Sequence, residues 1–167
     1  MLNNYSAFFR SSKLSLTIAV AAFATAAASS AQAKTPGKTY CENDVCHRVM
    51  TIAETEAVIG IADWQLVSFY DDCTRDKGNP CSALSSGEKF RPGEADNAAS
   101  PIYPNGTTIS VFNPATQRSA VLRVNNSGPY HGHRKLDVSK GAAETLGFTD
   151  SGVANLRVTV IGAPRAE

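Results

Sequence analysis

Short segments of strand-like sequence, each interrupted by a turn, constrain the fold of this chain more than any other feature. TTISVFN (107–113) and RSAVLRVN (118–125) flank a turn and predict a β-hairpin. DWQLVSFY (63–70) and NLRVTVIG (155–162) predict two further strands. Because side chains alternate between the two faces of a strand, one face of each should enter the core. The side chains expected inside are Leu122, Val124, Leu156 and Val158.

Two short helices are predicted between the strands. The capping-box sequence that begins at Thr51 predicts a helix over 51–59. Ser139 is a favourable N-cap for a second helix, which should end at Leu146 just before a glycine. About five short strands and two short helices predict a small, mainly β barrel.

The N-terminal sequence is typical of a secretory signal peptide. Arg10 and Lys13 precede an apolar run, LSLTIAVAAFATAAA (14–28), and cleavage is expected after Ala33. A membrane anchor is the alternative, but spanning a bilayer takes about 20 apolar residues. We therefore expect a periplasmic or secreted monomer that has no membrane anchor after cleavage.

The rest of the chain is expected to form one domain of ordinary size. Removing residues 1–33 from the 167 leaves 134, enough for one hydrophobic core. We expect an N-terminal hairpin and helix over 34–59 and the barrel over 60–167. With 16 basic and 15 acidic residues, the chain has no charge excess that would favour nucleic acid as a partner.

All four cysteines lie in the part expected to be exported, where disulfides are the default. In YCENDVCHRV, a two-residue Asn-Asp turn would place Cys41 opposite Cys46. Cys73 and Cys81 would then close a second local loop. Zinc is the alternative, but neither spacing is the short one typical of zinc sites.

Five sequence blocks follow one another between about residues 60 and 161. They are SSGEKF, AASPIYPNGT, RSAVLRVNNSGPY, RKLDVSKGAAETLG and GVANLRVTVI. Their order and spacing resemble the rare lipoprotein A family of double-psi β-barrel domains. The resemblance implies a mainly β fold, a small six-stranded double-psi β-barrel with two short helices. It also implies peptidoglycan glycan strands as the partner, and neither a metal nor a cofactor. The best-studied members are lytic transglycosylases that prefer glycan stripped of its peptide stems.

The chain departs from the family pattern at two positions. Asn126 stands where the family usually has an acid, and Ser100 stands where it usually has a histidine. Two acids of the pattern are retained, Glu88 and Asp137. By resemblance, we expect all four side chains to line one shallow groove.

Lytic transglycosylation needs only one acid/base, because the substrate's own 6-hydroxyl is the nucleophile. Asp137 is the better candidate by resemblance, and Glu88 is a second candidate. Each has a structural alternative: Asp137 can bond turn amides near the helix start, and Glu88 can simply be solvated. Asn126 cannot transfer a proton but can bind a sugar hydroxyl or N-acetyl group.

Several neighbouring residues are candidates for substrate contacts. Tyr130 can stack on a sugar ring or pack over the Gly-Pro turn, and Arg134 can reach a sugar carboxylate. His131 and His133 flank a glycine, but no third metal ligand is evident nearby. Trp64 is expected in the core, because another apolar residue follows on the same face of its strand.

Three functions fit the sequence. The first is a peptidoglycan lytic transglycosylase that works through Asp137, with Glu88 as a second candidate acid. The second is a glycan-binding or expansin-like wall-loosening module that keeps the groove without turnover. The third is a structural or inhibitory protein built on a disulfide-held barrel. The polar groove residues favour the first two, and the resemblance makes glycan cleavage the leading activity.

Overall fold

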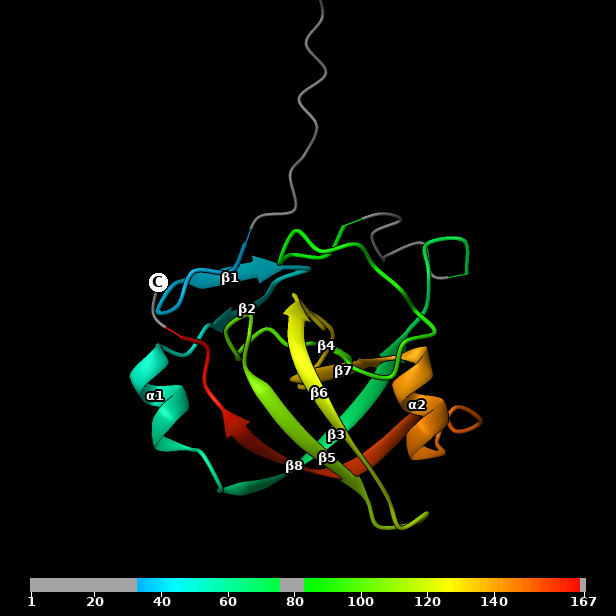
Figure 1. Ribbon diagram of the computed structural model, residues 1–167. Helices are drawn as coiled ribbons and strands as arrows, with labels where there is room; N and C mark the ends of the chain where they lie inside the picture. The colour runs from blue at the N-terminus through cyan, green and yellow to red at the C-terminus, as the bar shows by residue number, and fades with distance from the viewer. Residues whose placement is uncertain (1–32, 76–82, 166–167) are drawn as a thin grey trace, which may run out of the picture.

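The computed structural model describes residues 33–75 and 83–165, and a closed six-stranded barrel is its main feature (Figure 1). Two helices and a separate two-stranded hairpin accompany the barrel. The hairpin strands are β1 (Thr39–Glu42) and β2 (Val45–Arg48), and the helices are α1 (Ile52–Ala57) and α2 (Lys140–Leu146). The barrel strands are β3 (Ala62–Tyr70), β4 (Asn97–Ala99), β5 (Thr108–Asn113), β6 (Arg118–Asn126), β7 (Leu136–Ser139) and β8 (Val153–Gly162).

The barrel mixes parallel and antiparallel pairs, in the order β3-β7-β4-β6-β5-β8. β3 runs parallel to β7 and antiparallel to β8, and β4 runs parallel to β6. Two parallel strand pairs within a closed six-stranded barrel are consistent with the double-psi fold. The prediction of a mainly β, six-stranded barrel with two short helices is confirmed.

The barrel interior is filled with aliphatic side chains from every strand. The four residues predicted to lie inside are all buried, so this expectation is confirmed. Helix α2 and the residues after it close part of the core with Leu146 and Phe148. The fully buried aliphatic residues of this core include Val67, Ile109, Val111, Leu122, Val124, Leu136, Val138 and Leu156.

The prediction that Trp64 is a core residue is wrong. Trp64 is 56% exposed and Leu66 is 51% exposed. Strand β3 carries apolar residues on both faces, and the structure turns Gln65 and Val67 inward instead. The alternation was correctly predicted, but the choice of the inner face was not.

Both helices begin with the predicted caps. The Thr51 hydroxyl accepts a hydrogen bond from the Glu54 amide at 3.2 Å, and Glu54 Oε2 accepts one from the Thr51 amide at 2.7 Å. The Ser139 hydroxyl accepts from the Ala142 amide at 3.3 Å. Gly147 ends α2 with a φ of 73°, which suits glycine.

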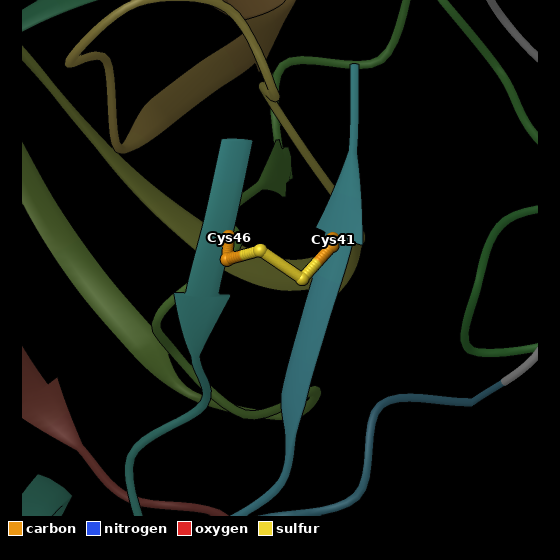
Figure 2. Close-up of a disulfide and its surroundings, with 2 residues drawn as sticks. All are labelled: Cys41 and Cys46. Carbon is orange, nitrogen blue, oxygen red and sulfur yellow. A yellow bond between two sulfur atoms is a disulfide. The ribbon is translucent and has the colours of Figure 1, made fainter. Parts of the chain in front are cut away.

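The N-terminal hairpin is held by a disulfide (Figure 2). Cys41 pairs with Cys46 in the register of β1 and β2, with an S–S distance of 2.03 Å. Both residues of the Asn-Asp turn have positive φ, 51° and 61°, as the predicted turn requires. This predicted disulfide is confirmed. The predicted Cys73–Cys81 pair involves residue 81, which lies outside the described residues.

The predicted signal peptide falls almost entirely on residues 1–32, outside the described part of the chain. Within 33–75 and 83–165, neither helix has the length and apolar character needed to cross a membrane.

Candidate functional site

A cavity of about 200 Å³ lies where the hairpin tip meets the ends of β3, β6 and β7. Four of the predicted site residues line it: Asn126, Tyr130, Arg134 and Asp137. Its other lining residues are Glu42, Asn43, Phe69, Tyr70, Ala99, Ser127, Gly128, Pro129 and His131. The polar turn that follows β6 therefore forms one wall, and the disulfide-held hairpin contributes another.

Asp137 occupies the middle of the barrel wall beside this cavity. Strand β7 lies between β3 and β4, so Asp137 pairs in register with Ser68 on one side and Ala99 on the other. It belongs to a strand, and Ser139 is the N-cap of α2. The N-cap of α2 is thus the residue two positions after Asp137.

A chain of hydrogen bonds joins Arg134 to Asp137 through Ser68. Arg134 Nη1 donates to the Ser68 hydroxyl, which donates to Asp137 Oδ1. The guanidinium polarises the hydroxyl, and charge-assisted bonds of this kind are among the stronger ones in proteins. The arrangement fixes the direction of the carboxyl group. Sequence reasoning missed Ser68, because only the pairing of β3 with β7 brings it to Asp137.

Tyr70 also lines this cavity. Its ring is stacked on Phe90, with a centroid distance of 5.0 Å. The hydroxyl is buried and has no hydrogen-bond partner among the described residues. Burial, and then the charges of Asp137 and Asp96, raise the pKa of Tyr70. The phenol therefore stays protonated.

The polar groups of Asn126 make hydrogen bonds within the protein. Its Oδ1 accepts a hydrogen bond from the Ser85 amide at 3.1 Å, which anchors the loop before Glu88. Its main-chain oxygen accepts from the Ser100 amide at 3.1 Å. The side chain is buried apart from the part that faces the cavity.

Lys34 binds main-chain groups at the end of β6 and after β4, and this role was not predicted. Its Nζ donates to the main-chain oxygens of Ser100 at 2.5 Å, Tyr103 at 2.8 Å and Asn126 at 3.0 Å. Burial lowers the pKa of Lys34 to about 7. The amine thus ties the end of β6 to the loop after β4. No sequence signal marks it, because its three acceptors are main-chain groups.

Ser100 is fully buried and lies outside the cavity lining. Its hydroxyl donates to the Lys135 oxygen at 2.9 Å and accepts from the amides of Ile102 and Tyr103 at 3.2 and 3.1 Å. These three hydrogen bonds satisfy the hydroxyl and fix the turn after β4. Ser100 was expected to line the groove, but it does not line the cavity.

Glu88 also lies outside the cavity lining, in an ion pair. Its carboxylate receives two hydrogen bonds of 2.6 Å from Arg123, and Asn125 Nδ2 donates a third at 3.1 Å. Hydrogen bonding to Arg123 is the main cause that lowers the pKa of Glu88. A carboxylate held ionised in this way is a poor proton donor. The single groove predicted to contain all four residues therefore contains only Asn126 and Asp137 of them.

Tyr130 both packs on the turn and lines the cavity. A Cβ placed on Gly128 would lie 3.7 Å from Tyr130 Cδ2, so the ring covers that glycine. Burial raises the pKa of Tyr130, and so do the nearby Glu42 and Tyr40. His131 lines the same cavity, but His133 lines a different one. Within the described ranges, no three His, Cys, Asp or Glu side chains cluster as metal ligands would.

Comparison with known proteins identifies the family. The model of the family described as "Lytic transglycolase" matches residues 67–158, more than half of the chain. The matched segment runs from β3 to β8 and contains both Ser68 and Asp137. The chain belongs to the rare lipoprotein A family of double-psi β-barrels.

Curated members of the rare lipoprotein A family are similar in sequence to this chain. A protein of Nostoc sp. named "Probable endolytic peptidoglycan transglycosylase RlpA" is 41% identical over 97 residues, 58% of this chain and 25% of that protein. The "Endolytic peptidoglycan transglycosylase RlpA" of Campylobacter jejuni is 33% identical over 134 residues, 80% of this chain and 45% of that protein. The chain thus spans less than half the length of these two relatives.

Proposed function

We propose that this chain is an exported lytic transglycosylase that cleaves stem-free peptidoglycan strands in the cavity beside Asp137. The observation that carries the proposal is the position of Asp137, which faces the cavity and is oriented by Ser68 and Arg134. The names of the family relatives support peptidoglycan as the substrate class. The predicted signal peptide supports a periplasmic location.

In the proposed reaction, Asp137 is the only acid/base. It donates its proton to the oxygen of the leaving sugar as the glycosidic bond breaks. It then accepts the proton of the 6-hydroxyl, whose oxygen bonds to the same anomeric carbon and forms a 1,6-anhydro ring. No water is consumed, and a second carboxylate is not required, in contrast to ordinary glycoside hydrolysis.

The neighbouring side chains position the substrate and the acid. The Ser68 hydroxyl and Arg134 hold the carboxyl group in one orientation, which favours a productive geometry. Tyr130 offers part of its ring to the cavity, where it can pack on a sugar. We assign Ser100 and Glu88 to structural support, because their polar groups are bonded within the protein.

A binding module without turnover is the second candidate. The observation that favours it concerns the side chains of Ser100 and Asn126, the two positions that depart from the family pattern. Neither side chain can transfer a proton in the way that the family's histidine and acid can, and both make hydrogen bonds within the protein. A groove of this kind would bind glycan and disturb wall contacts as expansins do.

Product analysis separates the two candidates. The purified protein is incubated with isolated peptidoglycan and with stem-free glycan strands, and mass spectrometry is used to detect 1,6-anhydro ends. The enzyme hypothesis predicts such ends, released mainly from stem-free strands. If the protein sediments with either material but forms no 1,6-anhydro product, the binding module replaces the enzyme.

A further inference from the structure

A second, smaller cavity lies on the outer face of β3, next to the site already described. It has a volume of about 120 Å³ and is lined by Asp63, Trp64, Gln65, Leu66, His133 and Lys135. Trp64 and Leu66 are more than half exposed, although both are large and apolar. Large apolar side chains gathered on an exposed surface are typical of binding sites.

The two cavities are linked by two segments of the chain. On β3, the side chains of Trp64, Leu66 and Ser68 follow one another on the same face, and Ser68 contacts Asp137. At the rise of a strand, Trp64 and Ser68 are separated by about 13 Å along β3. This distance places both cavities within reach of one extended polymer.

The basic segment before β7 makes the second link. Arg134 lines the first cavity, whereas its neighbours His133 and Lys135 line the second. Lys135 immediately precedes β7, which runs parallel to β3. The three consecutive side chains are thus divided between the two cavities and carry basic groups to both.

The chemistry of the second cavity suits a sugar that bears a carboxylate. Aromatic and aliphatic surfaces pack on the apolar faces of sugar rings. The ammonium group of Lys135 can pair with a carboxylate, and His133 can donate a further hydrogen bond. Asp63 lines the same cavity, but its Oδ2 already accepts a hydrogen bond from Gln65 Nε2 at 3.2 Å. Hydrolysis of the amide that joins a peptide stem to muramic acid leaves such a carboxylate on the lactyl group.

We infer that this cavity is a second subsite for the same glycan strand, in which Trp64 and Leu66 pack on a sugar ring and Lys135 binds a lactyl carboxylate. The inference rests on the proposed function, because it extends the strand bound beside Asp137. It also gives a physical reason for a preference for stem-free glycan. An intact stem converts the carboxylate to an uncharged amide and removes the partner of Lys135.

The inference is tested by binding measurements with ligands of two lengths. Calorimetry compares a stem-free disaccharide with a stem-free octasaccharide for the wild type, Trp64→Ala and Lys135→Met. Trp64→Ala should weaken octasaccharide binding roughly tenfold and leave disaccharide binding unchanged. Lys135→Met should weaken binding of the octasaccharide but not of one whose lactyl carboxylates have been amidated. Val121→Ala is the matched control, because Val121 is also exposed but lines neither cavity.

The outcomes separate the second subsite from the proposed function. If the wild type binds and cleaves the octasaccharide and both variants bind it equally well, the second subsite is wrong and the proposed function stands. If the wild type binds neither ligand, both are wrong. Melting curves should show all three variants folded, because the substituted side chains lie at the surface. Trp64→Phe should restore most of the binding that Trp64→Ala loses.

Discussion

Asp137 and Glu88 are the two acids retained from the family pattern, and they occupy different surroundings. Asp137 lies in a strand at a cavity wall and accepts a hydrogen bond from a serine hydroxyl. Glu88 lies in a loop outside the cavity lining, where Arg123 and Asn125 donate to its carboxylate. The cavity leaves room for a substrate beside Asp137, whereas Glu88 lies outside that cavity and is bonded directly to Arg123. Retention in sequence therefore does not assign a role, but the local partners do.

The largest expected effect comes from Asp137→Asn. The amide keeps the shape of the carboxyl group and can accept the hydrogen bond from Ser68, but it cannot transfer a proton. Formation of 1,6-anhydro ends from stem-free glycan should fall by about 10²-fold or more. Binding of the strand should change little, which sedimentation with the same glycan would check. An equal loss of binding and turnover would indicate a positioning role instead.

Ser68→Ala should lower turnover less than Asp137→Asn does. It removes the hydroxyl that connects Arg134 to Asp137, and with it one of the groups that orient the carboxyl. We expect turnover to fall roughly tenfold with substrate affinity nearly unchanged. Ser68→Thr retains the hydroxyl and should recover most of the rate. If Thr and Ala variants are equally slow, the hydroxyl is not the reason for the loss.

Titration of Lys34 should make the free energy of unfolding depend on pH. Its pKa is about 7 in the folded state and 10.5 for the unperturbed group, so between these values the unfolded chain binds more protons. The free energy of unfolding should therefore rise with pH over this range, relative to Lys34→Met. Denaturant titrations of both proteins from pH 7 to pH 10 measure the difference. A difference that is constant with pH would mean that Lys34 titrates at the same pH in both states.

Glu88→Gln should have the smallest effect, a change in stability whose pH dependence lies in the acid range. The pKa of Glu88 is lowered in the folded state, so its ion pair stabilises the protein above the unfolded value near 4.5. This contribution is lost as pH falls through the lower, folded value. Because both partners are partly exposed, Glu88→Gln should cost less than about 1 kcal/mol at neutral pH. Thermal melts at pH 7 and pH 3 would test this, and a larger cost at pH 3 than at pH 7 would contradict it.

Much of the fold was predictable, because the longer strands and the helix caps depend on local sequence. The alternation in β6 and β8 placed their inner faces correctly, and Ser139 fixed the start of α2. The strands β4 and β7 were not predicted, because three and four residues give no readable period. The assignment of Trp64 to the core was wrong because both faces of β3 carry apolar residues.

The site was less predictable, because its contacts join distant parts of the chain. Lys34 reaches main-chain oxygens 66 and 92 residues away, which no residue pattern reports. Ser68 reaches Asp137 only through the parallel pairing of β3 with β7. The family pattern correctly drew attention to the turn after β6, but it could not tell that Ser100 is fully enclosed.

The most direct test measures turnover of Asp137→Asn and Glu88→Gln side by side. Both substitutions replace a carboxylate with the corresponding amide. The chemical change is therefore the same at the two positions. Each variant is incubated with the same stem-free glycan, and 1,6-anhydro ends are counted by mass spectrometry after melting curves have shown that both are folded. We expect Asp137→Asn to form about 10²-fold fewer ends than the wild type and Glu88→Gln to form nearly as many as the wild type. Loss of product with Glu88→Gln and full activity with Asp137→Asn would contradict this expectation.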